Sequence, residues 1–187
     1  MGQPESAAGS AAGQRFRADD ARHLLCVIHE ATNTALRDRC AGARSGFGGS
    51  YSELVVDNAK ANVSASSAVV AAKLRADSTI DAVLSLDADV TTEIVEPAVI
   101  AARANSHTEI GSFDLNVALI DDIKSGKVAW TVDQQEYLYG YLPIFALKLY
   151  KQGLFEMGAE DVIKTGPSFD DKSNIDRISQ YVRQGIR

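Results

Sequence analysis

The chain has 187 residues, of which 45% are hydrophobic and 24% charged, and these values are typical of a globular protein with one substantial core. Its formal net charge of -6 argues against nucleic-acid binding, because neutralising phosphates requires a basic face. No apolar run approaches the roughly 20 residues that span a bilayer, and the polar start Met-Gly-Gln-Pro-Glu-Ser does not read as a secretory signal.

Predicted helices and strands alternate along the chain. Ala/Gly-rich and amphipathic patterns place helices at residues 6–16, 34–47, 64–76, 91–105 and 115–124. Runs of aliphatic, β-branched and aromatic residues place strands at residues 24–28, 54–56, 80–86, 109–113 and 128–132. A helix separates each strand from the next, and this order predicts an α/β fold with a three-layer, doubly wound parallel sheet.

The first half of the chain contains clustered small residues and two cysteines, and both allow structural predictions. The Ala/Gly-rich stretch 6–16 suits a helix packed closely against the sheet. Gly46, Gly48 and Gly49 follow a helix rather than joining a strand to one, so we expect them to end that helix rather than to hold a phosphate. Cys26 lies in a predicted strand and Cys40 in a predicted helix, and we expect buried free thiols in preference to a disulfide.

The sequence lacks the motifs of common catalytic and metal sites. Neither Gly-x-Ser-x-Gly nor Gly-x-Gly-x-x-Gly occurs, so a nucleophile elbow and a phosphate loop are both missing. No Cys-x-x-Cys or His-Glu-x-x-His motif supports a metal site. We therefore expect a protein that is not an enzyme and that has no catalytic residues, cofactor or metal.

Polar side chains follow every predicted strand. They are His29-Glu30 with Asn33, Asp57-Asn58, Asp87 with Asp89, Asp114, and Asp133-Gln134. Ligands of open parallel sheets bind beyond the carboxyl ends of the strands, where these residues should meet. Helix capping by Asp and Asn is the alternative explanation, but it accounts less well for the Gln134-Gln135 pair. Carboxylates and amides together suit a ligand rich in hydroxyl groups.

The segment from Glu136 onward reads as a helix that is apolar on nearly every side. Its large side chains are Tyr137, Leu138, Tyr141, Leu142, Ile144, Phe145, Leu147 and Leu149. A helix without a polar face is normally covered on all sides, and an uncovered apolar patch is typical of an association site. We therefore expect a homodimer through the Tyr137–Leu149 helix.

Several blocks resemble the sugar-binding periplasmic proteins of bacterial ABC transporters, of the ribose-binding type. The blocks cover residues 25–30, 37–40, 110–114, 123–127, 131–135, 140–143 and 165–167. The resemblance implies a flavodoxin-like lobe of a type I periplasmic binding protein. Such a protein is a two-lobed clamp that closes on a monosaccharide or related polyol and presents it to an ABC permease. It also implies a periplasmic location, although the chain as given, without a signal peptide, would stay in the cytoplasm.

In that family a first lobe of about a hundred residues precedes the segment that matches this chain. The resemblance therefore implies a carboxyl-terminal half: residues 2–134 form the second lobe, and residues 135–187 form a crossover helix and a return segment that would pack on the first lobe. Half a clamp should bind its sugar weakly or not at all. The alternative is an effector-binding regulatory domain of the sugar-responsive repressor type, which shares this fold.

The resemblance also implies the ligand-binding residues. Arg37 matches an arginine that reaches sugar hydroxyls, although a surface ion pair with Asp38 or Glu30 is an alternative role for it. Gln134 matches the hinge glutamine that contacts the ligand. Weaker matches are Asn33, Asp87, Asp89 and Asp114. The chain departs from the family at Ala43, where relatives usually have a larger apolar residue, and at Ala88, where they have proline or a polar ligand residue.

Overall fold

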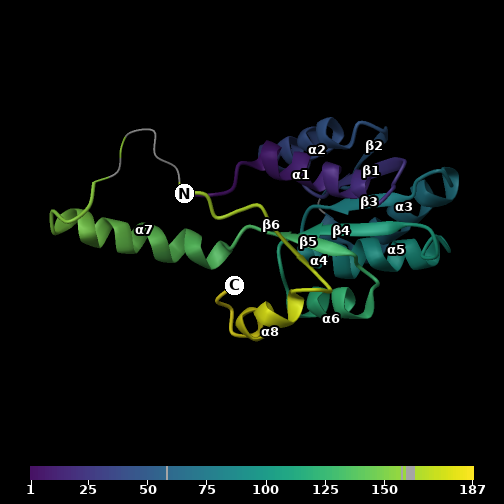
Figure 1. Ribbon diagram of the computed structural model, residues 1–187. Coiled ribbons are helices and arrows are strands. Elements are labelled where there is room, and N and C mark those ends of the chain that lie inside the picture. Colours follow the sequence, from purple (N-terminus) through teal and green to yellow (C-terminus); the bar gives the residue numbers. More distant parts are fainter. Residues whose placement is uncertain (58, 157, 159–162) are drawn as a thin grey trace.

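Six strands form one sheet in the computed structural model, which describes residues 1–57, 59–156, 158 and 163–187 (Figure 1). They are β1 (His23–Ile28), β2 (Ser50–Val55), β3 (Ala82–Ser85), β4 (Glu109–Phe113), β5 (Trp130–Asp133) and β6 (Ser168–Asp171). Their order is β2-β1-β3-β4-β5-β6, with β1 to β5 parallel and β6 antiparallel to β5. The expected doubly wound α/β sheet is confirmed, with one antiparallel edge strand that the local sequence pattern does not predict.

Helices cover both faces of this sheet, so the fold has three layers (Figure 1). One face carries α1 (Glu5–Ala18) and α2 (Thr34–Phe47), and the other carries α3 (Val63–Ala76), α5 (Glu96–Ala101), α6 (Val117–Ser125) and α8 (Ile175–Arg183). Three short turns precede α3 and α5: η1 (Ala59–Ala61), α4 (Ala88–Val90) and the π-helical η2 (Thr91–Val95). None of the described helices combines the length and the apolar character needed to cross a lipid bilayer.

The side chains of β1 divide the core into its two layers. Leu24, Cys26 and Ile28 pack with α1 and α2, whereas Leu25 and Val27 pack with the helices of the opposite face. All five are fully buried. Because successive side chains of a strand point to opposite faces, a continuous apolar run needs a helical layer on each side.

Glycines allow α1 and α2 to lie unusually close together. A Cβ added at Gly9 would lie 2.0 Å from the carbonyl oxygen of Arg39, and one added at Gly46 would lie 2.1 Å from that of Ser10. The small residues of α1 thus serve contact with α2 as well as with the sheet. Gly46 was expected at the end of a helix but lies inside α2, which ends at Gly48 with a left-handed φ of 64°.

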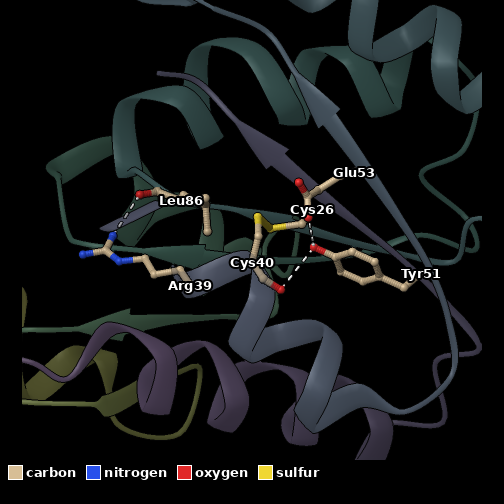
Figure 2. Close-up of a disulfide and its surroundings, with 6 residues drawn as sticks. All are labelled: Cys26, Arg39, Cys40, Tyr51, Glu53 and Leu86. Atoms are coloured by element: carbon tan, nitrogen blue, oxygen red, sulfur yellow. Dashed lines mark hydrogen bonds between the residues drawn. A yellow bond between two sulfur atoms is a disulfide. The ribbon is translucent and has the colours of Figure 1, made fainter. Parts of the chain in front are cut away.

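The two cysteines form a disulfide, so the expectation of free thiols is wrong (Figure 2). Cys26 lies on the face of β1 that α2 covers, and Cys40 lies on the face of α2 that meets β1; their Cα atoms are 5.9 Å apart. This distance is within the range that a disulfide spans. The hydroxyl of Tyr51 donates to the carbonyl oxygen of Cys40 at 3.1 Å and to Glu53 at 2.9 Å beside the bridge.

Helix α7 (Glu136–Lys151) extends away from the sheet (Figure 1). None of its residues is buried, and Tyr137, Tyr141 and Phe145 form a stack with ring centroids 5.8 and 6.4 Å apart. The chain then returns: β6 pairs with β5, and α8 inserts Ile175 and Ile178 into the core. Of residues 135–187, β6 and α8 therefore belong to the same layered unit as the preceding strands.

Candidate ligand-binding site

The carboxyl ends of the parallel strands bring the polar residues to one edge of the sheet. Each of β1, β3, β4 and β5 is followed within a few residues by polar side chains that were predicted to form the site. Asn58, named with the end of the second predicted strand, lies outside the described residues. Apart from His29, Asp57 and Asp133, the remaining polar residues fall into three groups, formed around Asp87, Asp114 and Asn33.

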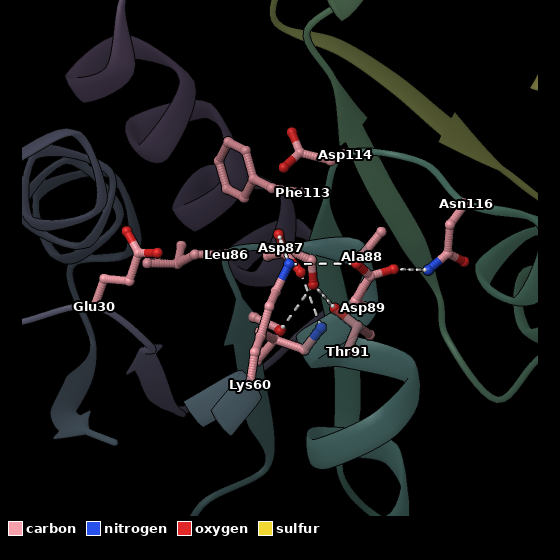
Figure 3. Close-up of polar contacts among 12 residues, drawn as sticks. Glu30, Lys60, Leu86, Asp87, Ala88, Asp89, Thr91, Phe113, Asp114 and Asn116 are labelled. Carbon is pink, nitrogen blue, oxygen red and sulfur yellow. Dashed lines mark hydrogen bonds and ion pairs between the residues drawn. The ribbon is translucent and has the colours of Figure 1, made fainter. Parts of the chain in front are cut away.

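The first group joins Asp87 and Asp89 through a lysine (Figure 3). Lys60 Nζ donates to Asp87 Oδ2 at 2.9 Å and to Asp89 Oδ2 at 3.3 Å. Asp87 Oδ1 caps α4 by accepting from the Val90 N–H at 3.0 Å, and Asp89 Oδ1 accepts from Asn116 Nδ2 at 2.7 Å. All four carboxylate oxygens of the pair thus have a donor partner.

Electrostatics favours the ionised form of Asp87. Burial acts to raise the pKa of this carboxyl, but the hydrogen bond from the Val90 N–H and the ammonium of Lys60 outweigh it, and the pKa lies below its ordinary value. An ionised carboxylate is an acceptor only, so Asp87 is suited to accept from hydroxyl groups of a ligand.

The second group links the end of β4 to the end of β5. Gln134 Nε2 donates to Asp114 Oδ1 at 2.5 Å, while Gln134 Oε1 accepts from the Tyr139 hydroxyl at 2.8 Å. Burial, reinforced by the nearby Glu136, raises the pKa of Asp114 to about 8 against the opposing effect of Arg39. Asp114 also has a positive φ of 66°, a conformation uncommon for a residue with a side chain.

Arg39 completes the second group, although it was not among the predicted site residues. Its guanidinium donates to Leu86 O at 3.2 Å, as Figure 2 shows, to Gln134 Oε1 at 3.2 Å, and to Glu5 Oε2 at 2.6 Å. It also lies 4.4 Å from the centre of the Phe113 ring. Only 5% of Arg39 is exposed, so this buried cation joins α1, α2 and the ends of β3 and β5.

The third group lies at the start of α2. Asn33 caps this helix through a hydrogen bond that its Oδ1 accepts from the Ala35 N–H at 3.1 Å, and its Nδ2 donates to Glu30 Oε2 at 3.0 Å. Arg37 is exposed, and its Nε donates to Ala31 O at 2.8 Å. In the part of the chain that the structure describes, Arg37 forms no ion pair with Glu30 or with the adjacent aspartate.

Figure 3 shows how the groups lie at this edge. The Lys60–Asp87 pair is central, with Phe113 and Asp114 on one side and Glu30 on another. Beneath it, the π-helical turn is tied to the sheet because the Thr91 hydroxyl lies 2.6 Å from the hydroxyl of Ser112 in β4, within hydrogen-bond distance. π-Helical turns are frequent at functional sites. The described residues contain no group of three or more His, Cys, Asp or Glu that could hold a metal ion.

The edge thus presents carboxylates, amides and guanidinium groups. Carboxylate oxygens accept from hydroxyls, and amide and guanidinium N–H groups donate to them. This combination matches a small ligand that carries several hydroxyl groups, each of which both donates and accepts.

A comparison with protein families matches residues 2–154 to a model described as a periplasmic binding protein domain. Among solved structures, a carbohydrate transporter from Acidothermus cellulolyticus in complex with myo-inositol is 34% identical. It aligns with 100% of this chain and 64% of its own, with a TM-score of 0.91. A search of curated proteins found no match.

Two further structures show the same fold at lower identity. An arabinose-binding protein from Geobacillus stearothermophilus is 18% identical, with a TM-score of 0.75 over 94% of this chain and 63% of its own. A periplasmic solute-binding protein of an ABC transporter from Actinobacillus succinogenes, with bound D-allose, is 17% identical, with a TM-score of 0.77 over 95% and 62%. The chain therefore spans less than two thirds of the length of each of these three structures.

Proposed function

Because this chain belongs to the family of periplasmic binding protein domains, we propose that it forms the carboxyl-terminal lobe of a solute-binding protein for a monosaccharide or related polyol. In this role it binds and does not catalyse, and the complete protein delivers its ligand to an ABC-type permease. The similar structures support this choice, since they include a carbohydrate transporter in complex with myo-inositol and a solute-binding protein with bound D-allose.

The main observation behind the proposal is that hydrogen-bond acceptors and donors lie together at the carboxyl ends of the parallel strands. Asp87 and Asp114 come from different strands, and Gln134 lies within hydrogen-bond distance of Asp114. We assign ligand contacts to these three residues, to Asp89 beside Asp87, and to Arg37. Asn33, which caps α2 and holds Glu30, acts at the rim of the same surface.

The disulfide supports a periplasmic location. Disulfides such as Cys26–Cys40 persist in oxidising compartments and are rare where cellular thiols are kept reduced. A solute-binding protein of an uptake system works outside the cytoplasmic membrane. The disulfide and the family therefore both support a periplasmic location.

We further propose that α7 and the chain around it contact a second lobe in the complete protein. The support is that α7 has no buried residue, although it carries the exposed side chains of Tyr141, Ile144 and Phe145. The solved relatives also have more chain than the part that matches here. In the 187-residue chain alone, a second copy takes the place of that lobe, which gives a homodimer through residues 137–149.

The alternative of a repressor-type effector domain has less support. The fold is shared, so the fold alone does not decide. The three similar structures described above are a carbohydrate transporter, an arabinose-binding protein and a transporter's solute-binding protein.

Calorimetry of the 187-residue chain tests the proposed function. The probes are myo-inositol, D-allose, L-arabinose and D-ribose, with sodium citrate as an unrelated solute. A lobe that covers one side of the ligand should bind at least one of the sugars with a Kd of about 1 mM or weaker, equivalent to about 4 kcal/mol. Micromolar binding by a monomer would contradict the division into lobes, and equal heats for citrate and all sugars would contradict sugar binding.

A further inference from the structure

Lys60 reaches the candidate site from outside the strand ends. It lies in η1, after β2, and its side chain crosses to the end of β3, where Asp87 and Asp89 lie (Figure 3). The side chain of Lys60 is 49% exposed, so the ammonium lies at the surface that a ligand would meet. No motif in the sequence selects this residue.

The ammonium of Lys60 occupies the position between two carboxylates. It lies 2.9 Å from Asp87 Oδ2 and 3.3 Å from Asp89 Oδ2. The other oxygens of the pair are held by the Val90 N–H and by Asn116 Nδ2. The two Oδ2 atoms are therefore oriented toward one cation, and the chain itself supplies that cation.

The arginines at this edge have other partners. Arg39 is buried against Glu5 and Gln134, and Arg37 donates to the carbonyl oxygen of Ala31. Among the described residues, no other lysine or arginine is in ion-pair contact with Asp87 or Asp89, so removing Lys60 would leave both side chains without a cationic partner.

We propose that Lys60 is a specificity-determining residue, whose ammonium between Asp87 and Asp89 makes the site select uncharged polyhydroxy ligands over ligands that carry a protonated amine. The inference rests on the proposed function, because it concerns the choice among sugars at the same site. A carboxylate has about four lone-pair sites, so a hydroxyl can add to oxygens that already accept from Lys60. A second ammonium at that position would lie beside the first and be repelled.

Matched ligand pairs test this selection by NMR titration of the ¹⁵N-labelled 187-residue chain, following the amides of Val90 and Thr91. The probes are myo-inositol with an amino-deoxy-inositol, and D-galactose with D-galactosamine, at about pH 6, where an alkyl amine is protonated. The wild type should bind each neutral probe at least about tenfold more tightly than its amine, a difference of about 1.4 kcal/mol.

Two variants separate charge from shape. Lys60→Met removes the ammonium and keeps an unbranched side chain, and it should move the neutral-to-amine ratio of Kd values by at least about tenfold toward the amine. Lys60→Arg keeps the charge and should retain the wild-type preference. A ratio that is the same in the wild type and in Lys60→Met overturns the proposal, whatever happens to the individual affinities.

A second titration decides the outcome if no sugar binds. Calcium ion, a hard cation that prefers oxygen ligands, should shift the Val90 and Thr91 amides of Lys60→Met at concentrations at least about tenfold lower than in the wild type. Adding Asp87→Asn to Lys60→Met should abolish this gain. Calcium binding gained without any sugar binding would reject the proposed function, and with it the selection among sugars, but would leave the exclusion of cations by Lys60 standing. Equal calcium binding in the wild type and Lys60→Met would overturn the role of Lys60.

Discussion

Gln134 Nε2 donates to Asp114 Oδ1 across a distance of 2.5 Å and thereby joins the ends of two neighbouring strands. The amide orientation is fixed from the other side, because Gln134 Oε1 accepts from both Arg39 and Tyr139. Gln134 also directly precedes Gln135, the N-cap of α7, so the proposed ligand-binding edge and the base of the projecting helix share one hydrogen-bond network.

The raised pKa of Asp114 predicts that stability falls as pH rises. A carboxyl with a pKa of about 8 in the folded chain and an ordinary pKa of about 4 when unfolded binds more protons in the folded state between these values. The free energy of unfolding should therefore decrease from about pH 4 to about pH 8, and Asp114→Asn should make this decrease smaller by up to a few kcal/mol. Urea unfolding across this range measures both curves.

The matched control for this prediction is Asp38→Asn, a change at an exposed position. Burial also raises the pKa of Glu109 to about 7 and that of Asp170 to about 6, so part of the decrease should remain in Asp114→Asn. Identical pH dependence in the wild type and Asp114→Asn would contradict the assignment of the raised pKa to Asp114.

The two arginines of α2 should differ in what they contribute. Arg39→Met leaves Glu5, Leu86 O and Gln134 Oε1 without their shared buried donor, and it should cost about 2–4 kcal/mol in the free energy of unfolding. Arg37→Met affects an exposed side chain and should cost less than about 1 kcal/mol, while it weakens sugar binding. Chemical denaturation and NMR titration of both variants compare them. Equal losses of stability in Arg39→Met and Arg37→Met would contradict the prediction that the buried arginine contributes more to stability than the exposed one.

The disulfide should make a substantial contribution to stability. It joins residues 14 positions apart, and closing a loop of about that length corresponds to about 3 kcal/mol in the chain-entropy treatment. Cys26→Ala/Cys40→Ala should therefore lower the urea midpoint clearly, and the wild type unfolded with a thiol reductant should show a similarly lowered midpoint. Detection of two free thiols in oxidised, denatured wild type would refute the bridge itself.

The uncovered face of α7 predicts self-association of the 187-residue chain. Sedimentation velocity should find dimers at tens of micromolar, since burying the stacked rings can offset an association cost of about 4–15 kcal/mol. Tyr141→Glu/Phe145→Glu should be monomeric, whereas Lys172→Glu, a charge change at an exposed position outside α7, should still dimerise. A monomeric wild type in which the α7 amides are protected from hydrogen exchange would exclude this interface.

The order of helices and strands could be predicted because it depends on local patterns. The apolar run of β1 and the alternation around Trp130 locate strands without any knowledge of the fold. The edge strand β6 could not be found in this way, because Ser168–Asp171 has one large apolar side chain and depends on pairing with β5. Helix α8 did carry a signal: Ile175, Ile178 and Val182 follow helical spacing.

The location of the site at the carboxyl ends of the strands could be predicted from the sequence. The side-chain contacts within the site could be predicted only in part. Parallel strands must bring Asp87 and Asp114 to the same edge, whatever the details of packing. Arg39 follows Leu36 and precedes Ala43 at helical spacing, and both of these are buried. Its position on the inner face of α2 could therefore have been predicted. The positions of Lys60 and of the Cys26–Cys40 bridge depend on how η1 and α2 pack on the sheet, which spacing alone does not determine.

The central claim is that the carboxyl edge of this sheet binds a sugar, and chemical-shift mapping tests it most directly. The ¹⁵N-labelled wild type is titrated with myo-inositol to about 50 mM, because a single lobe should bind with a Kd of about 1 mM or weaker. The amides of Val90, Asp114 and Gln134 should move along saturable curves, and those of Ala82 and Glu109, at the opposite ends of their strands, should stay fixed. Saturable shifts confined to Ala82 and Glu109, or no shift at any edge residue with myo-inositol and equally none with D-allose, L-arabinose and D-ribose, would contradict the claim.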